Sequence, residues 1–226
     1  MKKYFSIQQL ERAADIYIFG DIVPFEFFSS DVSAYGIVEQ IKNLDVDEIR
    51  VHIDSYGGSV SEGWAIYNAL RQHPAKVTTY GDGFVASAAL YPFLAGDNRI
   101  ASNLSAYYLH RVSISADGYS DDLRKAADEA DQMTEIGISA FVERTGMDEN
   151  DARKLMEAET WLSPDQAMEY GIATAIADDN VMLVVQDAKK SIMQRVLNKP
   201  AEKNHKDDHQ KEPVEKTLRE KIKNMI

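Results

Sequence analysis

The sequence predicts an α/β fold in which helices cover a sheet, and three observations indicate it. Segments rich in β-branched and aromatic residues alternate along the chain with segments whose apolar residues recur at helical spacing. A length of 226 residues suits one domain with a substantial core. An apolar share of 44% and a charged share of 27% are typical of a globular protein.

Six segments are expected to be strands because of their β-branched and aromatic residues. In chain order they are residues 16–20, 48–54, 77–80, 98–101, 106–110 and 172–177. The glycine-bearing stretch after residue 80 is expected to form a turn, followed by small residues and then a helix.

The expected helices cover residues 32–44, 60–73, 120–145, 148–158 and 163–171. Ser30 or Asp31 is a candidate cap for the first, and Pro74 stops the second. The last has a serine cap, a proline at its first position and a glycine at its end. A further helix starting near Ser87 would meet Pro92 in its first turns, which predicts a kink or a late start.

The C-terminal part has a different composition, and we expect a main domain over residues 1–184 and a charged extension over 185–226. From Lys199 onward, eight Lys/Arg and six Asp/Glu give a net charge of +2, against −12 for the whole chain. Residues 201–213 carry too few apolar side chains to form a core and are interpreted as a linker. The end regains apolar residues on one helical face, so it is either a docking helix or a frayed end: Val214, Leu218, Ile222 and Met225.

Composition also excludes several classes of function. The chain has no cysteine, which excludes disulfides and a thiol nucleophile. It has no apolar run near the roughly 18 residues of a membrane span and no signal-peptide pattern, so a cytoplasmic protein is expected. A net charge of −12 argues against a nucleic-acid partner. No histidine pair has the spacing of metal ligands with a third ligand nearby, so no zinc site is expected.

A candidate nucleophile and a candidate oxyanion site follow two of the predicted strands. Ser87 is expected at a helix start, where the helix dipole and the next backbone N–H, that of Ala88, favour an anionic oxygen. The alternative is a helix cap with no further role. Gly57 and Gly58 follow another strand, and N–H groups at such a turn can hold an oxyanion, although an isolated Gly-Gly also fits a plain turn.

A candidate base and a candidate acid occur later in the chain. His110 ends a predicted strand, where it could take the serine proton, or simply be a hydrogen-bonded histidine at a sheet edge. Glu159 lies in the link between two predicted helices, where it could orient the histidine, or be an ordinary surface glutamate. Asp165 is the second candidate for the acid.

Taken together, these stretches resemble the ClpP serine peptidase family. The similarity covers residues 15–180 and rests on IDSYGGSVSEGWAIYNAL, GFVASAALYPFLAGDNRIASNLSAYYLHR and AETWLSPDQAMEYGIA, with 23 residues from Ser87 to His110 and 49 from His110 to Glu159. The resemblance implies a ClpP/crotonase-like spiral of ββα units, with residues 120–145 as a projecting handle helix. It implies Ser87 as nucleophile, His110 as base, and Gly58 and Ala88 as the oxyanion hole.

The chain also departs from the family pattern. Glu159 takes the place of the usual Asp, Tyr56 that of a Pro, and Arg111-Val112 that of a Gln-Pro. The Glu-Thr-Trp sequence and the charged tail are similar to the ClpP-like proteases of bacteriophages and prophages. We therefore expect a head maturation protease that cuts scaffold or capsid protein in the host cytoplasm.

The implied reaction is peptide hydrolysis through an acyl-enzyme, which needs no metal and no organic cofactor. The implied assembly is a homo-oligomer of stacked rings. Two alternatives remain. The chain could be the proteolytic subunit of an ATP-dependent degradation machine, with an AAA+ unfoldase supplied separately because the sequence has no Walker motif. It could also be a catalytically silent assembly factor or a crotonase-like acyl-CoA enzyme on the same fold.

Overall fold

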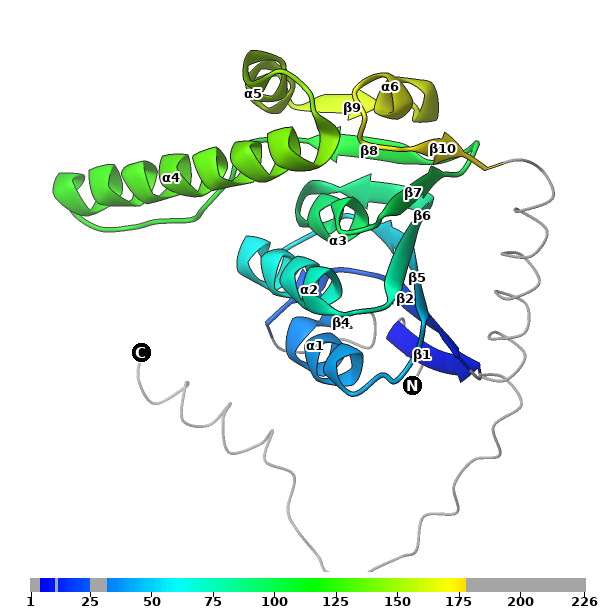
Figure 1. Cartoon of the computed structure of the whole chain (residues 1–226). Coiled ribbons are helices and arrows are strands. Elements are labelled where there is room, and N and C mark those ends of the chain that lie inside the picture. Colours follow the sequence, from blue (N-terminus) through cyan, green and yellow to red (C-terminus); the bar gives the residue numbers. More distant parts are fainter. Residues whose placement is uncertain (1–4, 11, 25–31, 178–226) are drawn as a thin grey trace, which may run out of the picture. The chain divides into compact units, whose positions relative to one another are not determined.

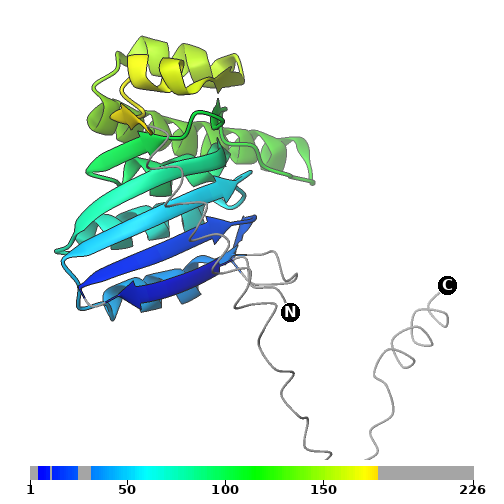
Figure 2. The same ribbon diagram turned by 90° about the vertical axis from the view of Figure 1, so that its right-hand side faces the viewer.

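The computed structural model describes residues 5–10, 12–24 and 32–177, and its central feature is a sheet of eight strands. The strands run in the order β1-β2-β5-β6-β7-β10, with β8 paired to β6 and β9 paired to β8. Figure 1 shows helices α1, α2 and α3 on one face of this sheet. Figure 2 shows the strands side by side from the opposite face, with the helices behind them. The predicted α/β class is confirmed.

The strands are β1 (Phe5–Leu10), β2 (Ala13–Phe19), β3 (Ile22–Val23), β4 (Val32–Ser33), β5 (Glu48–Ser55), β6 (Lys76–Ala86), β7 (Asn98–Ala101), β8 (Ala106–Leu109), β9 (Thr160–Leu162) and β10 (Ala175–Ile176). The helices are α1 (Ala34–Lys42), α2 (Val60–Gln72), α3 (Leu90–Leu94), α4 (Ser120–Thr145), α5 (Glu149–Glu157) and α6 (Pro164–Glu169), and a 3₁₀ turn, η1 (Ser87–Ala89), precedes α3.

Parallel pairing dominates the sheet. Strands β2, β5, β6 and β7 pair in parallel, β8 is parallel to β6, and β1 and β9 are antiparallel to their neighbours. Central strands carry fully buried branched residues, among them Ile16, Ile18, Ile49, Val51 and Ile53. Because β5, β6 and β8 run in the same direction, their carboxyl ends meet at one edge of the sheet.

Strand β6 is longer than predicted, because the glycine-bearing stretch after residue 80 continues the strand instead of turning. A Cβ atom at Gly81 would lie 2.4 Å from the Tyr107 hydroxyl, and one at Gly83 would lie 2.3 Å from Asp54 Oδ1. These glycines therefore allow close approach within a sheet, which sequence alone does not distinguish from a turn. The Phe84 N–H donates to Asp54 Oδ1 at 3.0 Å, where the β5–β6 register shifts.

Other predicted bounds also change. The strand predicted at 172–177 is reduced to β10, because the Ala173 N–H donates to the Ala167 carbonyl and the Ile172 carbonyl accepts from Arg99. The helix predicted at 32–44 begins at Ala34, after β4, and its predicted caps lie outside the described residues. Strands β1, β3, β4 and β9 were not predicted. The late start predicted from Pro92 is confirmed, since η1 precedes α3.

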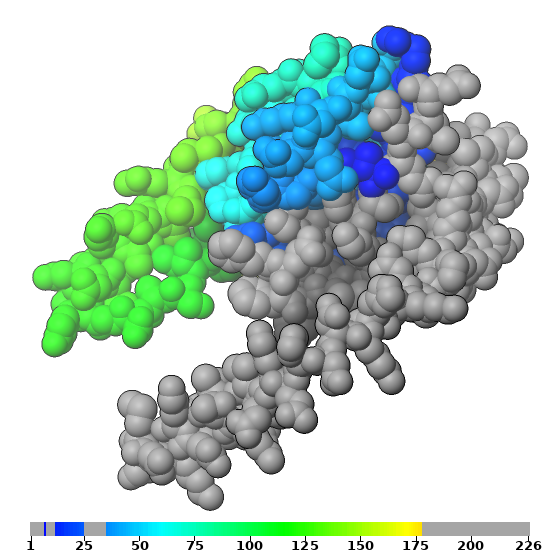
Figure 3. All heavy atoms as spheres, turned by 90° about the horizontal axis from the view of Figure 1, so that it is seen from below, coloured from blue at the N-terminus to red at the C-terminus, as the bar shows by residue number. Residues whose placement is uncertain are grey.

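Helix α4 has the bounds predicted for it. It begins with a capping box between Tyr119 and Asp122 and ends before Gly146, whose φ of 72° suits a left-handed helix cap. Its buried residues all lie in its second half: Thr134, Gly137, Ile138 and Phe141. The first half therefore extends beyond the other helices, as the green residues in Figures 1 and 3 show.

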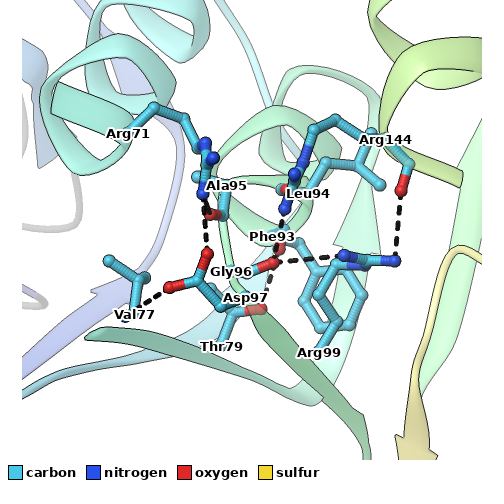
Figure 4. A network of polar contacts seen from close by, with 10 residues as sticks. All are labelled: Arg71, Val77, Thr79, Phe93, Leu94, Ala95, Gly96, Asp97, Arg99 and Arg144. Carbon is cyan, nitrogen blue, oxygen red and sulfur yellow. Dashed lines mark hydrogen bonds and ion pairs between the residues drawn. The ribbon is translucent and has the colours of Figure 1, made fainter.

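A buried arginine joins the ends of several elements (Figure 4). Arg99, 6% exposed, donates hydrogen bonds to the carbonyls of Gly96, Arg144, Gly171 and Ile172. Arg144 itself donates to the carbonyls of Leu94 and Gly96. Because the last carbonyls of a helix have no partner within it, these bonds satisfy the Leu94 carbonyl of α3 and the Arg144 carbonyl of α4. The other bonds hold the segments that follow α3 and α6. Burial and the charge of Arg144 lower the pKa of Arg99.

The predicted boundary between residues 184 and 185 and the predicted apolar helix near the C-terminus lie outside the described residues. Within the described ranges, no helix combines the length and apolar character that a membrane crossing requires.

Candidate active site

The candidate site forms where the carboxyl ends of β5, β6 and β8 meet. Gly57 and Gly58 follow β5, Ser87 follows β6 directly, and His110 follows β8 directly. The β6–β8 register pairs Ala86 with Tyr108, so the next residues of both strands emerge at the same edge. Parallel pairing therefore explains why residues 23 positions apart in the sequence lie together.

Ser87 and His110 are in direct contact. The Ser87 Oγ lies 2.6 Å from His110 Nε2, a short hydrogen-bond distance. Ser87 has a φ of 54°, a left-handed conformation that is uncommon for a residue other than glycine. Among the described non-glycine residues only Ser87 and Glu159, at 51°, have a positive φ. Strained backbone of this kind clusters at functional sites, which favours a functional interpretation of both residues.

The environment of His110 suits a base. Burial lowers its pKa from 6.5, and the nearby charge of Glu159 opposes this shift. The depressed pKa keeps the imidazole neutral at pH 7, and a neutral ring nitrogen can accept the Ser87 proton.

Glu159 lies beside His110 because β9 pairs with β8. Leu109 pairs with Thr160 in an antiparallel register. His110, which follows Leu109, therefore lies opposite Glu159, which precedes Thr160. Glu159, predicted in a link between two helices, lies between α5 and strand β9, which was not predicted. In the described part of the chain its carboxylate is not hydrogen-bonded to His110. Its Oε2 instead lies 3.5 Å from the Tyr108 hydroxyl, the outer limit for a hydrogen bond.

The Gly57-Gly58 turn packs directly against the backbone of Ser87. A Cβ at Gly57 would lie 2.5 Å from the Ala86 carbonyl and 2.8 Å from the Ala88 nitrogen, so only glycine fits there. The Gly57 N–H donates to Ser55 Oγ, and Ser55 Oγ donates to the Gly20 carbonyl, which fixes the turn.

The N–H groups of Gly58 and Ala88 remain as candidate oxyanion donors. Ile22 forms an isolated β-bridge with this segment. In it, the Ile22 N–H donates to the Gly57 carbonyl, and the Ser59 N–H donates to the Ile22 carbonyl. The Gly58 N–H takes no part in that bridge. Ala88 is the second residue of η1, where backbone N–H groups have no partner within the helix. Both residues line the same pocket as Ser87 and His110.

That pocket, of about 40 Å³, has polar and apolar parts, and Arg111 and Ser113 contribute polar groups beside Ser87 and His110. Its lining residues are Gly58, Val60, Ser87, Ala88, Leu90, Tyr91, Leu109, His110, Arg111, Val112, Ser113, Phe141 and Met156. The apolar wall comes from α2, α3, α4 and α5, so helices distant in the sequence shape one cavity beside Ser87. Helical periodicity alone does not distinguish the wall of a pocket from the core, because both are apolar helix faces.

The other histidines within the described ranges are engaged elsewhere. His52 Nδ1 lies 3.0 Å from Asp82 Oδ2, and its ring stacks between Tyr17 and Tyr80. His73 contacts the Leu44 carbonyl and accepts from the Ala75 N–H. Asp165, the second candidate acid, is exposed in the first turn of α6, and no contact with His110 is formed in the described structure. In the same ranges no group of three or more His, Asp or Glu residues could hold a metal ion.

Tyr108 is a site residue that the sequence analysis did not select. Its ring stacks on that of His110 with centroids 5.3 Å apart and an interplanar angle of 18°. Its hydroxyl reaches Glu159, so it touches both the base and the acid. The alternation of side chains along a strand places residues 108 and 110 on one face, and that signal could have identified it.

Comparison with known proteins places this fold and site in a family. The family model described as Clp protease matches residues 6–180 of this chain. The chain therefore belongs to the Clp protease family. A ClpP1 N165D mutant from Listeria monocytogenes has 26% identity and a TM-score of 0.62, covering 74% of this chain and 92% of that one. The predicted ClpP-like fold and the predicted class, a ClpP-type serine endopeptidase, are confirmed at the level of the family.

The curated relatives carry related names. An ATP-dependent Clp protease proteolytic subunit 2 from Treponema denticola is 33% identical over 57% of this chain and 66% of its own length. The protein of the same name from Borreliella burgdorferi is 31% identical over 60% of this chain and 69% of its own. The matched segments thus span about two thirds of each relative. These names correspond to the degradative alternative better than to the expected head maturation protease.

Proposed function

We propose that this chain hydrolyses peptide bonds through an acyl-enzyme, with Ser87 as nucleophile and His110 as general base. The observation that supports this most directly is the 2.6 Å contact between Ser87 Oγ and His110 Nε2. His110 takes the Ser87 proton as Oγ attacks the scissile carbonyl, and then donates it to the leaving amine. A water molecule, deprotonated by the same nitrogen, releases the acyl group and restores Ser87.

The oxyanion of the tetrahedral intermediate is assigned to the Gly58 and Ala88 N–H groups. Their place in the pocket lining beside Ser87 supports this. One such donor typically contributes about 3 kcal/mol to transition-state stabilisation. The acyl-side residue of the substrate enters the pocket beside Ser87, whose apolar wall includes Leu90, Phe141 and Met156.

Glu159 is proposed as the acid of the triad, acting through its charge on His110. Its carboxylate favours the imidazolium that forms when Ser87 is deprotonated, as its effect on the pKa of His110 indicates. The Glu159 side chain, which is one methylene longer than that of Asp, also lies within 3.5 Å of the Tyr108 hydroxyl.

The test is reaction with a fluorophosphonate probe followed by intact-mass measurement of the whole chain. We expect one adduct on the wild type and none on Ser87→Ala, because the probe reacts only with an activated serine. Ser113→Ala is the matched control, since Ser113 is an exposed serine lining the same pocket, and it should label like the wild type. A labelled Ser87→Ala protein, or no adduct on either chain, would reject the proposal.

For the biological role we propose the proteolytic subunit of a degradation machine whose ATPase is a separate chain. Support comes from the relatives, which are named ATP-dependent Clp protease proteolytic subunits. The proposed assembly is a homo-oligomer of rings, supported by the exposed apolar residues Leu123, Met133 and Ile136 on α4. Degradation of a folded protein that requires both ATP and a partner ATPase is the expected result.

Head maturation is the second candidate. It is supported by Glu159 in the acid position, by the Thr160-Trp161 sequence after it and by the composition of the tail. Cleavage of a co-expressed capsid or scaffold protein without ATP, at one or a few sites, would favour it over degradation. The two roles use the same Ser87 chemistry, so the labelling experiment does not depend on which is correct.

A further inference from the structure

Four aromatic residues form a continuous series of ring contacts that ends at His110. Tyr56 and Phe84 have ring centroids 4.9 Å apart, Phe84 and Trp161 5.5 Å, and Trp161 and Tyr108 4.6 Å. Tyr108 then stacks on His110 at 5.3 Å. We call Tyr56, Phe84, Tyr108 and Trp161 the aromatic row.

The aromatic row lies on the sheet face away from the core. Tyr108 of β8 pairs directly with Trp161 of β9. On its other side Tyr108 pairs with Ala86 of β6, and Phe84 lies two residues before Ala86 on that strand. Side chains alternate along a strand, so these residues share one face. The residues between them point the other way and are buried: Val85, Tyr107, Leu109 and Leu162.

Much of the aromatic row is exposed. Tyr56 is 64% exposed, Trp161 47% and Phe84 38%. A contiguous exposed aromatic surface of this kind marks an interaction site, because covering it would remove apolar area from water. None of the three lines the pocket beside Ser87, so the row is a separate surface that meets the site at His110.

The chemistry of the site specifies which part of a substrate meets the row. The leaving amine takes its proton from His110 Nε2, so the chain that follows the scissile bond departs on the His110 side. The aromatic ring that stacks on His110 is that of Tyr108, the member of the row nearest the site. The acyl-side residue, in contrast, fills the pocket next to Ser87.

We propose that the aromatic row is a subsite for large apolar side chains, aromatic ones above all, in the first residues after the scissile bond. The proposal rests on the proposed peptidase function. Carboxylates flank the row at Glu159, which reaches Tyr108, and at Asp54, which accepts from the Phe84 N–H. Acidic residues at the same substrate positions are therefore disfavoured.

The test uses quenched fluorescent peptides that share one acyl-side sequence and carry Phe, Ala or Glu at the first and second positions after the scissile bond. We expect kcat/KM for Phe to exceed that for Ala by about three- to tenfold, the effect of one aromatic contact, with Glu lowest. Trp161→Ala and Phe84→Ala should reduce the preference for Phe to about onefold, and Trp161→Phe should restore it. Tyr56→Ala, at the most exposed position, provides a variant with little risk to folding.

Leu104→Ala is the matched control, because Leu104 is 88% exposed but forms no part of the row, and it should keep the preference for Phe. Fluorophosphonate labelling of every variant separates the two proposals. Labelled chains that cut all three peptides equally would overturn the subsite and leave the peptidase intact. An unlabelled wild type would reject the peptidase.

A binding measurement tests the row without catalysis. In Ser87→Ala, the Phe peptide should change the Trp161 emission, and this change should be absent when Trp161→Phe is added. No change in emission with the Phe peptide would overturn the proposal. A loss of oligomer mass in Trp161→Ala with the Phe preference unchanged would assign the row to contacts between copies and would also overturn it.

Discussion

Ser87 and Glu159 share an unusual backbone conformation, with φ values of 54° and 51°. Such a conformation costs on the order of 1–3 kcal/mol at each residue and persists only where surrounding structure enforces it. At Ser87 the enforcement is visible, because the glycine at position 57 lies against the backbone of residues 86–88. The strain turns the Ser87 hydroxyl toward His110 and leaves the Ala88 N–H beside the pocket.

The pH dependence of the reaction follows from His110. Burial lowers its pKa below 6.5 and the ring must be neutral to accept the Ser87 proton. Peptidase activity should therefore be full at neutral pH and fall as the pH drops through this depressed pKa. The profile of kcat/KM against pH between 4 and 8 should place the midpoint of the acid limb below 6.5.

Glu159→Gln tests the part that the carboxylate plays in this profile. Removing a charge that raises the pKa of His110 should move the acid limb to still lower pH. The plateau of kcat/KM should also fall, by about 100-fold or more, because the imidazolium loses its counter-charge. Glu159→Asp is the control, since Asp tolerates positive φ and keeps the charge, and it should retain most activity. An unchanged profile in Glu159→Gln would remove Glu159 from the triad.

At the scale of elements, the helix that begins at Ser87 is held at its far end by arginines. The Arg99 guanidinium donates to the Arg144 carbonyl in the last turn of α4 and to three carbonyls just after α3 and α6, so one side chain joins three parts of the chain that line or support the site. Arg144 ties the last turn of α4 to α3 through the Leu94 and Gly96 carbonyls.

Arg99→Met should destabilise the fold by about 2–4 kcal/mol, because it leaves buried carbonyls without a donor. Urea unfolding followed by circular dichroism measures this as a lower midpoint.

The matched control is Arg71→Met. Arg71 forms a 2.8 Å ion pair with Asp97 nearby, but its side chain is 36% exposed. An exposed pair of this kind contributes about 0–1 kcal/mol, so the control should unfold close to the wild type. Equal losses in both variants would show that Arg99 has no special role.

At the scale of the whole molecule, the proposed self-association can be tested on helix α4. Leu123 and Ile136 are 46% and 55% exposed on α4. Light scattering after size exclusion should give a mass several times that of one chain. Ile136→Glu should reduce it, because a charge then replaces apolar contact area, whereas Lys125→Gln, at another exposed position on the same helix, should not. A monomeric wild type would contradict the proposed assembly.

Removal of residues 199–226 should leave the fold intact. The buried apolar core of the described residues runs from Ala14 to Ala173, and residues 201–213 have the composition of a linker. We expect a change of less than about 1 kcal/mol in the free energy of unfolding, measured in urea against the full chain. Loss of a cooperative transition in the truncated chain would show that the tail belongs to the folded unit.

Much of the fold could be predicted from local patterns. The bounds of α4 agree with prediction, and the Ser163 cap and proline of α6 are visible in the sequence. These signals are local, since a helix makes its hydrogen bonds within one segment. The strands were predicted less well. The extension of β6 past Gly81 and Gly83 and the short β9 depend on partners remote in the sequence, which no local pattern contains.

The sequence by itself determined the α/β class, the family resemblance and the candidates Ser87, His110, Glu159, Gly58 and Ala88. Residue types and intervals are sufficient for that, because they state which chemistry is available. Only the tertiary structure decided that Ser87 and His110 touch, that Glu159 lies next to Tyr108 without bonding to His110, and that four aromatic rings lead away from the site. These are contacts between strands, and their distances follow from sheet register, which the chain reaches only when it folds.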